Sequence, residues 1–142
     1  MITVAGILTS KTSEIFSVSS STTVYDAIKL MSEKNIGALP VLDNNVLSGI
    51  FSERDYARKI ILLNRKSQDT LINEIMTATV ITVTPTDTID HCMEIMSAKK
   101  IRHLPVMQDD QLVGIISIGD VVTTIIQSQK ETITYLQNYI AQ

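Results

Sequence analysis

The chain has 142 residues, of which 44% are hydrophobic, and a formal net charge of −3 at pH 7. This length can bury one sizeable core, or two small cores that share an interface. The acidic balance, with a pI of about 5.3, argues against general nucleic-acid binding, because phosphate backbones demand a basic surface.

The chain carries one cysteine, Cys92, which excludes an internal disulfide and suits a reducing compartment. The N-terminus lacks a basic segment followed by an apolar run, and no apolar stretch approaches the ~18 residues of a membrane span. The sequence therefore predicts neither secretion nor membrane insertion, and we expect a cytoplasmic protein.

The first half of the chain alternates short β-branched runs with stretches of helical periodicity. Residues 1–9 fit either an extended arm or a short helix. Apolar side chains recur at helical spacing from Val24 to Met31, and Gly37 is expected to end this helix near Asn35. We predict, in order, a strand at 15–18, this helix, a hairpin at 39–51, a helix at 53–63 and an exposed polar connection at 64–70.

The second half repeats this order. From position 15 to 61, 16 of 47 residues are identical to the residue 65 positions further on, which is more than composition alone predicts. A short segment, here called the leader, precedes the first strand of each copy. The leader at 1–9 aligns with the leader at 71–77 only if three extra residues are allowed before Ile15. The second copy predicts a strand at 80–83, a helix at 88–99, a hairpin at 104–116 and a helix at 120–127.

This duplication predicts two β-α-β-β-α units of about 60 residues each, a size that is marginal for a domain alone. Packing the two sheets together would bury a shared apolar face and relate the units by a pseudo-two-fold axis. Clefts would remain on either side of the contact, and small ligands favour such places.

Each hairpin ends in a serine that an aspartate follows three residues later: Ser52 with Asp55, and Ser117 with Asp120. A side-chain oxygen at a strand-to-helix corner can cap the first free N–H groups of the helix. The same corner suits an anion. From the residues alone, helix capping is the simpler of these two interpretations.

Catalytic and metal-binding chemistry find little support in the sequence. His91 and Cys92 are adjacent, but no second His or Cys stands at metal-ligand spacing. A Cys–His nucleophile would require folding to bring the pair beside an oxyanion site. There is no Gly-x-Gly-x-x-Gly or phosphate-loop signature, so we expect no catalytic activity, no metal and no catalytic cofactor.

The duplicated pattern resembles the CBS domain pair, or Bateman module, a regulatory unit found in inosine monophosphate dehydrogenase and in the γ subunit of the AMP-activated kinase. The resemblance covers roughly residues 1–127 and is carried by the stretches 36–55, 101–120 and 69–76. The run from Gly49 to Lys59 is similar to small stand-alone bacterial CBS-pair proteins.

The resemblance implies an α+β fold of two tandem β-α-β-β-α repeats with their sheets packed together. It places the first repeat at residues 1–68, the second at 69–127 and a C-terminal helical extension at 128–142.

The clefts of this family commonly bind adenine nucleotides such as AMP, ADP, ATP, NAD or S-adenosylmethionine. The resemblance therefore implies an adenine nucleotide as a regulatory ligand, with its ribose held by Asp55 and Asp120. The matching phosphate contacts are Ser52, Arg54, Arg58, Arg102, His103 and Ser117. The matching adenine slot is bordered by Val18, Ile36, Ala38, Pro40, Ile81, Val83, Ile101 and Pro105.

Simpler interpretations exist for many of these residues. Each arginine can instead pair with a nearby acid such as Glu53 or Asp55, and the apolar side chains can simply be core. The copies also differ at their basic positions, which favours one well-formed anionic site and a weaker or empty second cleft. The basic residues and their counterparts are Arg102-His103 opposite Gly37-Ala38, and Arg54 and Arg58 opposite Gly119 and Thr123.

Residues 128–142 carry an amphipathic stripe that includes Ile133, Leu136 and Ile140. This segment either folds back on its own module or forms a homodimer contact. The leading hypothesis is a non-catalytic sensor that binds an adenine nucleotide and signals to an effector protein on another chain. The alternative is a protein-interaction or structural module whose ligand clefts have degenerated.

Overall fold

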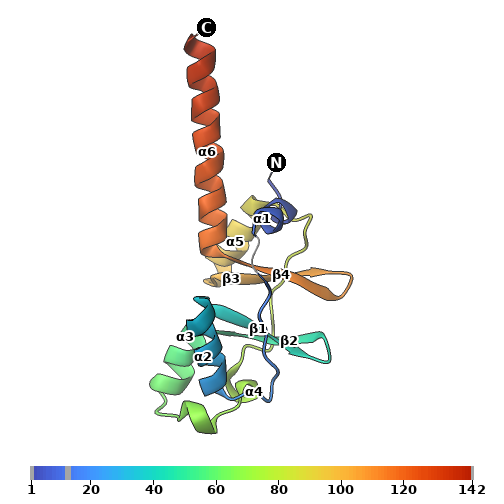
Figure 1. The fold of residues 1–142 in the computed structure, drawn as a ribbon, viewed down its shortest axis with the longest axis vertical. Coiled ribbons are helices and arrows are strands. Elements are labelled where there is room, and N and C mark those ends of the chain that lie inside the picture. Colours follow the sequence, from blue (N-terminus) through green and yellow to red (C-terminus); the bar gives the residue numbers. More distant parts are fainter. Residues whose placement is uncertain (1, 12–13, 142) are drawn as a thin grey trace.

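The computed structural model describes residues 2–11 and 14–141 of the chain (Figure 1). Two antiparallel hairpins lie one above the other in the middle of the molecule, and the shorter helices cover their outer sides (Figure 1). This arrangement confirms an α+β fold of two similar repeats followed by a C-terminal helix.

The elements follow the predicted order. They are α1 (Val4–Ser10), α2 (Val24–Lys34), β1 (Ala38–Asp43), β2 (Val46–Ser52), α3 (Glu53–Tyr56) with a π-helical continuation (Ala57–Ile61), a 3₁₀ turn (Ser67–Asp69), α4 (Ile72–Ile75), α5 (Ile89–Lys99), β3 (His103–Gln108), β4 (Gln111–Ser117) and α6 (Ile118–Ala141).

The two hairpins have the same turn and the same register. Each closes through two residues with left-handed backbone, at φ between 51° and 64°, which Asn and Asp tolerate well. In the first hairpin Val41 pairs with Gly49, and a bulge then shifts the register so that Leu42 pairs with Leu47. The second hairpin repeats this bulge at the matching positions.

The strands predicted at 15–18 and 80–83 are reduced to single parallel bridges, Val18 to Val41 and Val83 to Val106. The Val18 N–H donates to the Pro40 carbonyl oxygen, and Val18 accepts from the Leu42 N–H. Because proline has no N–H to donate, the ladder stops there, and Pro105 limits the second copy in the same way.

The predicted end of the first helix near Asn35 is confirmed, but two predicted details of the helices differ from the structure. The residue that ends α2 in the left-handed conformation is Asn35, at φ 54°, and Gly37 has no positive φ. The predicted helix at 53–63 changes to π-helical hydrogen bonding at Ala57, where the Leu62 N–H bonds the carbonyl oxygen five residues earlier.

In the predicted exposed connection, Thr70 is buried and its hydroxyl donates to the Lys66 carbonyl oxygen.

The hydrophobic interior consists of two clusters, and each includes a leader segment from the other half of the sequence. Val4 and Ile7 of α1 belong to the cluster built on α5, β3 and β4. Ile72 and Ile75 of α4 belong to the cluster built on α2, β1 and β2. The repeats therefore exchange their leaders, an arrangement that their order along the chain does not reveal.

Glycines in the second strand of each hairpin admit the exchanged leaders. A Cβ atom on Gly49 would lie 2.5 Å from Met76 Sδ, and one on Gly114 would lie 2.5 Å from Leu8 Cδ2. The Thr77 N–H and carbonyl oxygen also bond Ile50, so the chain after α4 is fixed on β2. The close packing at both glycines holds the repeats together.

The last helix, α6, starts at Ile118 and continues without a break past the predicted end at residue 127. It projects away from the two repeats (Figure 1), and its side chains are exposed from residue 129 to residue 141. The expectation that this segment folds back on its own module is therefore wrong. None of the helices within residues 2–11 and 14–141 combines the length and apolar character that a membrane span requires.

We predict that Gly49→Ala lowers the free energy of unfolding by about 1–3 kcal/mol, because the added methyl group overpacks the contact with Met76 and Thr77. Gly6→Ala is the matched control, since a Cβ at Gly6 meets no atom within 4 Å and alanine favours the helix. Urea unfolding measures both. Equal effects of the two substitutions would contradict the close leader packing.

Candidate functional site

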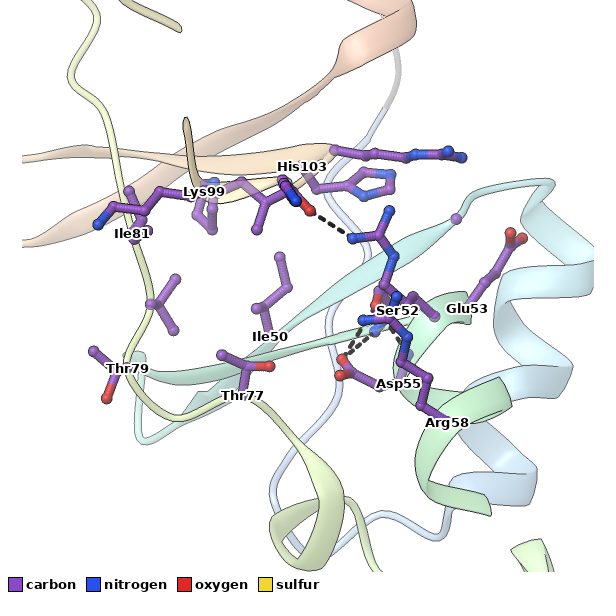
Figure 2. Close-up of a pocket in the computed structure, with 17 residues that line it drawn as sticks. Ile50, Ser52, Glu53, Asp55, Arg58, Thr77, Thr79, Ile81, Lys99 and His103 are labelled. Carbon is purple, nitrogen blue, oxygen red and sulfur yellow. Dashed lines mark hydrogen bonds between the residues drawn. The ribbon is translucent and has the colours of Figure 1, made fainter. Parts of the chain in front are cut away.

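A cavity of about 670 Å³ opens between the two repeats, which is within the usual size range of small-ligand sites. Figure 2 shows Ile81, Lys99 and His103 of the second repeat on one side, opposite Ile50, Asp55 and Arg58 of the first. Thr77 and Thr79, on the chain after α4, border the same space (Figure 2). Both repeats thus contribute to a single cavity.

The corner between β2 and α3 places a carboxylate on the cavity wall. The Asp55 N–H donates to Ser52 Oγ at 3.2 Å, and Asp55 Oδ2 accepts from the Ser52 N–H at 3.0 Å. This reciprocal capping box confirms the capping interpretation. Because Ser52 and Asp55 also line the cavity, capping fixes the carboxylate at a place that a ligand can reach.

Among the described residues, Asp55 forms one ion pair within 4.0 Å, with Lys59, which lies one turn further along the helical segment with its Nζ 3.3 Å from Asp55 Oδ1. The Lys59 ammonium also donates to the Ile75 carbonyl oxygen at 2.8 Å. Lys59 is not part of the cavity lining. The carboxylate is therefore held on its helix side and remains on the wall of the cavity.

Positive charge concentrates on the cavity wall although the whole chain is acidic. Among the described residues, none of the three arginines on this wall forms an ion pair within 4.0 Å. The predicted alternative, in which Arg54 or Arg58 pairs with Glu53 or Asp55, is thus not observed. The lining contains two carboxylates, Glu53 and Asp55, and five cationic side chains, Arg54, Arg58, Lys99, Lys100 and Arg102.

Arg54 crosses from one repeat to the other. Its Nη1 donates to the carbonyl oxygen of Lys100, the residue that ends α5 in the left-handed conformation. The guanidinium therefore links α3 of the first repeat to the second repeat at the edge of the cavity. Arg58 makes no comparable bond among the described residues, and its side chain is oriented beside Asp55 (Figure 2).

His103 is half-buried at the start of β3, next to Gly37. Burial lowers the pKa of this imidazole below its ordinary value of 6.5, and Lys11 and Arg102 lower it further, whereas Glu53 and Asp120 oppose the shift. A Cβ at Gly37 would lie 3.3 Å from His103 Nε2. Gly37 therefore provides the space that the imidazole fills.

The apolar part of the wall includes Ile50, Ile81, Ile101 and Pro105. Of the predicted adenine-slot residues, Val83 and Ala38 are instead buried, at 2% and 4% exposure. Val18 and Ile36 pack against the hydrophobic cluster built on α2, β1 and β2. The cavity combines the helix start of one repeat with the strand region of the other, so the remaining first-copy positions, Pro40 included, lie outside its lining.

Sequence reasoning missed several residues of the cavity wall. Thr77, Thr79 and Val80 follow α4 and reach the site only because the leaders are exchanged, which no local pattern predicts. The adjacent lysines at the end of α5 directly precede Arg102, so their place near the predicted phosphate contacts follows from the sequence. The lining residues outside the predicted set are Gly37, Ile50, Glu53, Thr77, Thr79, Val80, Lys99 and Lys100.

The matching corner of the second repeat has the same cap with a different cationic partner. The Asp120 N–H donates to Ser117 Oγ at 3.1 Å, and the Ser117 N–H donates to Asp120 Oδ2 at 2.8 Å. The Lys11 ammonium lies 2.8 Å from the same carboxylate oxygen. Ser117 and Asp120 are absent from the lining of the cavity described above, so the predicted residues divide between two separate corners.

The family model described as the CBS domain matches residues 4–62 and 72–127, which together form most of the chain. The chain therefore belongs to the CBS domain family and contains a tandem pair of these domains. CBS-domain pairs are regulatory modules, and no catalytic family accompanies this match.

Individual relatives agree with this assignment. The chain is 43% identical over 123 residues to the mitochondrial CBS domain-containing protein CBSX3 of Arabidopsis thaliana, and the match covers 83% of this chain and 60% of that protein. A solved putative signal-transduction protein with CBS domains from Burkholderia ambifaria superposes with a TM-score of 0.86 at 49% identity, covering 89% of this chain and 96% of that one.

A third comparison bears on ligands. The CBS domain pair of protein MJ0100, solved in complex with 5′-methylthioadenosine and S-adenosyl-L-methionine, matches with a TM-score of 0.80 at 30% identity. The match covers 90% of this chain and 98% of that one. Adenosine-type ligands are thus documented for a structural neighbour.

We predict that His103 titrates below 6.5, measured by proton NMR of its ring resonances against the same chain unfolded in urea. Because the folded pKa is the lower of the two, His103 contributes stability above pH 6.5, and this contribution is lost as the pH falls through the folded pKa. A midpoint in the folded protein at or above the unfolded one would contradict the burial of this imidazole.

Proposed function

We propose that this CBS pair is a regulatory module that binds an adenine nucleotide in the cavity between its repeats. One observation carries the proposal: a capped carboxylate, a cluster of cations and an apolar wall converge on one cavity of about 670 Å³. These three features correspond to the ribose, phosphates and base of a nucleotide.

The ribose would bind Asp55, since a carboxylate at a helix start can accept hydrogen bonds from two vicinal hydroxyls. Ser52 stands beside this carboxylate, with its hydroxyl already engaged in the cap. The base would lie against the apolar wall near Ile81, Ile101 and Pro105. This placement leaves the phosphates directed toward the cationic side of the cavity.

The phosphates would bind Arg58 and Arg102, with Arg54 and the lysines at the end of α5 contributing to the positive field. His103 would act as a neutral hydrogen-bonding group at pH 7, because burial lowers its pKa. The excess of cations on the wall favours an anionic ligand over S-adenosylmethionine, whose sulfonium is positively charged. We therefore place AMP, ADP, ATP and NAD ahead of S-adenosylmethionine.

Regulation requires that the ligand favour one arrangement of the two repeats over another. A nucleotide in this cavity would touch α3 of the first repeat and β3 of the second, so it contacts both. The hydrogen bond from Arg54 to the Lys100 carbonyl oxygen also links the two repeats, so a ligand that moves one repeat relative to the other would change this bond. The response would pass to an effector protein on another chain.

The direct test is thermal stability with AMP, ADP, ATP, NAD and S-adenosylmethionine in excess. A ligand that binds only the folded state at 100 times its Kd adds about 2.7 kcal/mol, which raises the Tm of a chain this size by several degrees. The absence of a shift with every ligand at millimolar concentration would favour the other candidate, an interaction module with degenerate clefts.

We predict that Arg58→Ala weakens AMP binding by tenfold or more in calorimetry, because a charge-assisted hydrogen bond contributes about 1.5–3 kcal/mol. Asp55→Asn should also weaken binding while it keeps the shape of the helix cap. Lys66→Ala is the control, since Lys66 is an exposed cation outside the cavity lining. An unchanged affinity of the Arg58→Ala protein for AMP would show that Arg58 does not bind the ligand.

A homodimer is part of the proposal and is supported by the exposed face of α6. Ile126, Ile133 and Ile140 are spaced by seven residues, and Leu136 lies on the same face. Isoleucine and leucine in a heptad arrangement favour two-stranded packing of parallel helices. The second copy would cover side chains that are 47–81% exposed in one chain.

We predict that Leu136→Asp shifts the protein from dimer toward monomer in light scattering, because a charge in the helix pair is strongly disfavoured. Asn138→Asp adds the same charge on the opposite face of α6 and should leave the mass unchanged. Truncation after Gln127 should have the same effect as Leu136→Asp. A truncated chain that remains a dimer would exclude α6 as the sole contact.

A further inference from the structure

The N-terminal leader brings a cation to the second corner. Lys11 directly follows α1, and its ammonium donates to Asp120 Oδ2 at 2.8 Å and to the Ile115 carbonyl oxygen at 2.9 Å. Both side chains are partly covered, with 29% and 24% exposure, so this ion pair is not a fully solvated surface contact. The contact joins residues that are 109 positions apart in the chain.

The exchange of leaders shows which position Lys11 occupies. Leu8 packs on Gly114 as Met76 packs on Gly49. Three residues beyond these anchors stand Lys11 in one leader and Thr79 in the other. Because Thr79 lines the first cavity, the matching position in the other leader places Lys11 at the Asp120 corner, where a second cleft would lie.

The cationic partners of the two aspartates are therefore not equivalent. Asp55 is paired with Lys59, which lies on the same helical segment and outside the cavity lining. The counterpart of Lys59 in the second repeat is Thr124, whose hydroxyl donates to the backbone of its own helix. Asp120 thus receives its cation from the exchanged leader and not from its own helix.

The arginines and the histidine of the first site have no basic counterparts at the second corner. Gly119 and Thr123 stand where the first repeat has arginines, and Gly37-Ala38 stand where the second repeat has Arg102-His103. The space next to Gly37 is filled by the His103 ring. At the Asp120 corner, the cation that could bind a phosphate is Lys11, and Lys11 is already paired with Asp120.

We propose that Lys11 occupies the ribose position at Asp120 and thereby restricts this CBS pair to one adenine nucleotide, bound at Asp55. Lys11 is then a specificity-determining residue, a cation supplied by the chain in place of a ligand's hydroxyl groups. This inference rests on the proposed function for the first cavity. It adds that the second cleft is closed by the protein itself and opens when the lysine is removed.

The ionisation of Asp120 is compatible with this role. Burial raises the pKa of the carboxyl group, but the Lys11 ammonium and the Ser117 N–H lower it more, so the net pKa lies below its usual value of 3.8. The carboxylate therefore stays charged at neutral pH, and the pair with Lys11 persists.

The test compares the wild-type chain with Lys11→Thr, which introduces the residue found at the matching position of the first leader. Adenosine is the probe, because Gly119 and Thr123 stand at the second corner where the first has arginines, and calorimetry gives the number bound per chain. We expect one adenosine for the wild type, lost in Asp55→Asn, and two for Lys11→Thr. The second binding event should disappear in Lys11→Thr/Asp120→Asn.

Two controls separate the ion pair from general effects. Lys66→Thr changes an exposed lysine outside the cavity lining and should leave the stoichiometry at one. Carbon-13 NMR of Asp120 gives a readout that needs no nucleotide, since its pKa should rise in Lys11→Thr. Lys11→Met keeps the apolar stem without the charge and serves if the threonine variant is unstable.

The possible failures are distinguishable. A Lys11→Thr chain that gains no second binding event overturns the inference, as does a wild-type chain that binds a second adenosine at Asp120. A wild-type chain that binds no adenosine, with binding gained at Asp120 in Lys11→Thr, would overturn the proposed first site and support the role of Lys11.

Discussion

The exchange of leader segments is the packing constraint on which the rest of this structure depends. Val4 and Ile7 complete the hydrophobic cluster of the second repeat, and Ile72 and Ile75 complete that of the first. Full burial of one such side chain contributes about 1.5–3 kcal/mol, so neither repeat retains its core without a segment from the other half of the chain. The exchange also brings Thr79 to one corner and Lys11 to the other, because each follows its leader at the same distance. Fold stability and the composition of the two clefts therefore have a common cause.

The difference between the clefts is explained by space as well as by sequence. The His103 ring fills the position where Gly37 has no side chain. A larger side chain at position 37 would meet this ring, so the basic pair of the second repeat is compatible with a small residue at the matching position of the first. The cations accordingly gather in the cavity that contains Asp55, which becomes locally positive in a chain of net charge −3. In the second corner a single lysine is bound directly to the carboxylate.

The repeat, both hairpins, the helix caps and the basic corner were predictable from the sequence, because each depends on local residue patterns. The duplication placed Ser52 with Asp55 and Ser117 with Asp120, and both capping boxes form. The destination of the leaders was not predictable, since apolar side chains fit either core equally well. For the same reason, the sequence did not separate core residues from cavity-wall residues among the apolar positions. Val83 and Ile81 carry similar side chains, and only the packing decides that Val83 is core and Ile81 is cavity wall. The role of Lys11 also follows only from the folded arrangement.

The proposed function requires that the cavity containing Asp55 bind an adenine nucleotide through groups from both repeats. Backbone NMR of the nitrogen-15-labelled chain, titrated with AMP, tests this claim residue by residue. A nucleotide in this cavity should shift the resonances of residues 52–58 and 99–105, which face the cavity from opposite sides, and should leave Ser117 and Asp120 nearly unchanged. Shifts confined to one repeat, shifts centred on Asp120, or unchanged spectra at millimolar AMP would each contradict it.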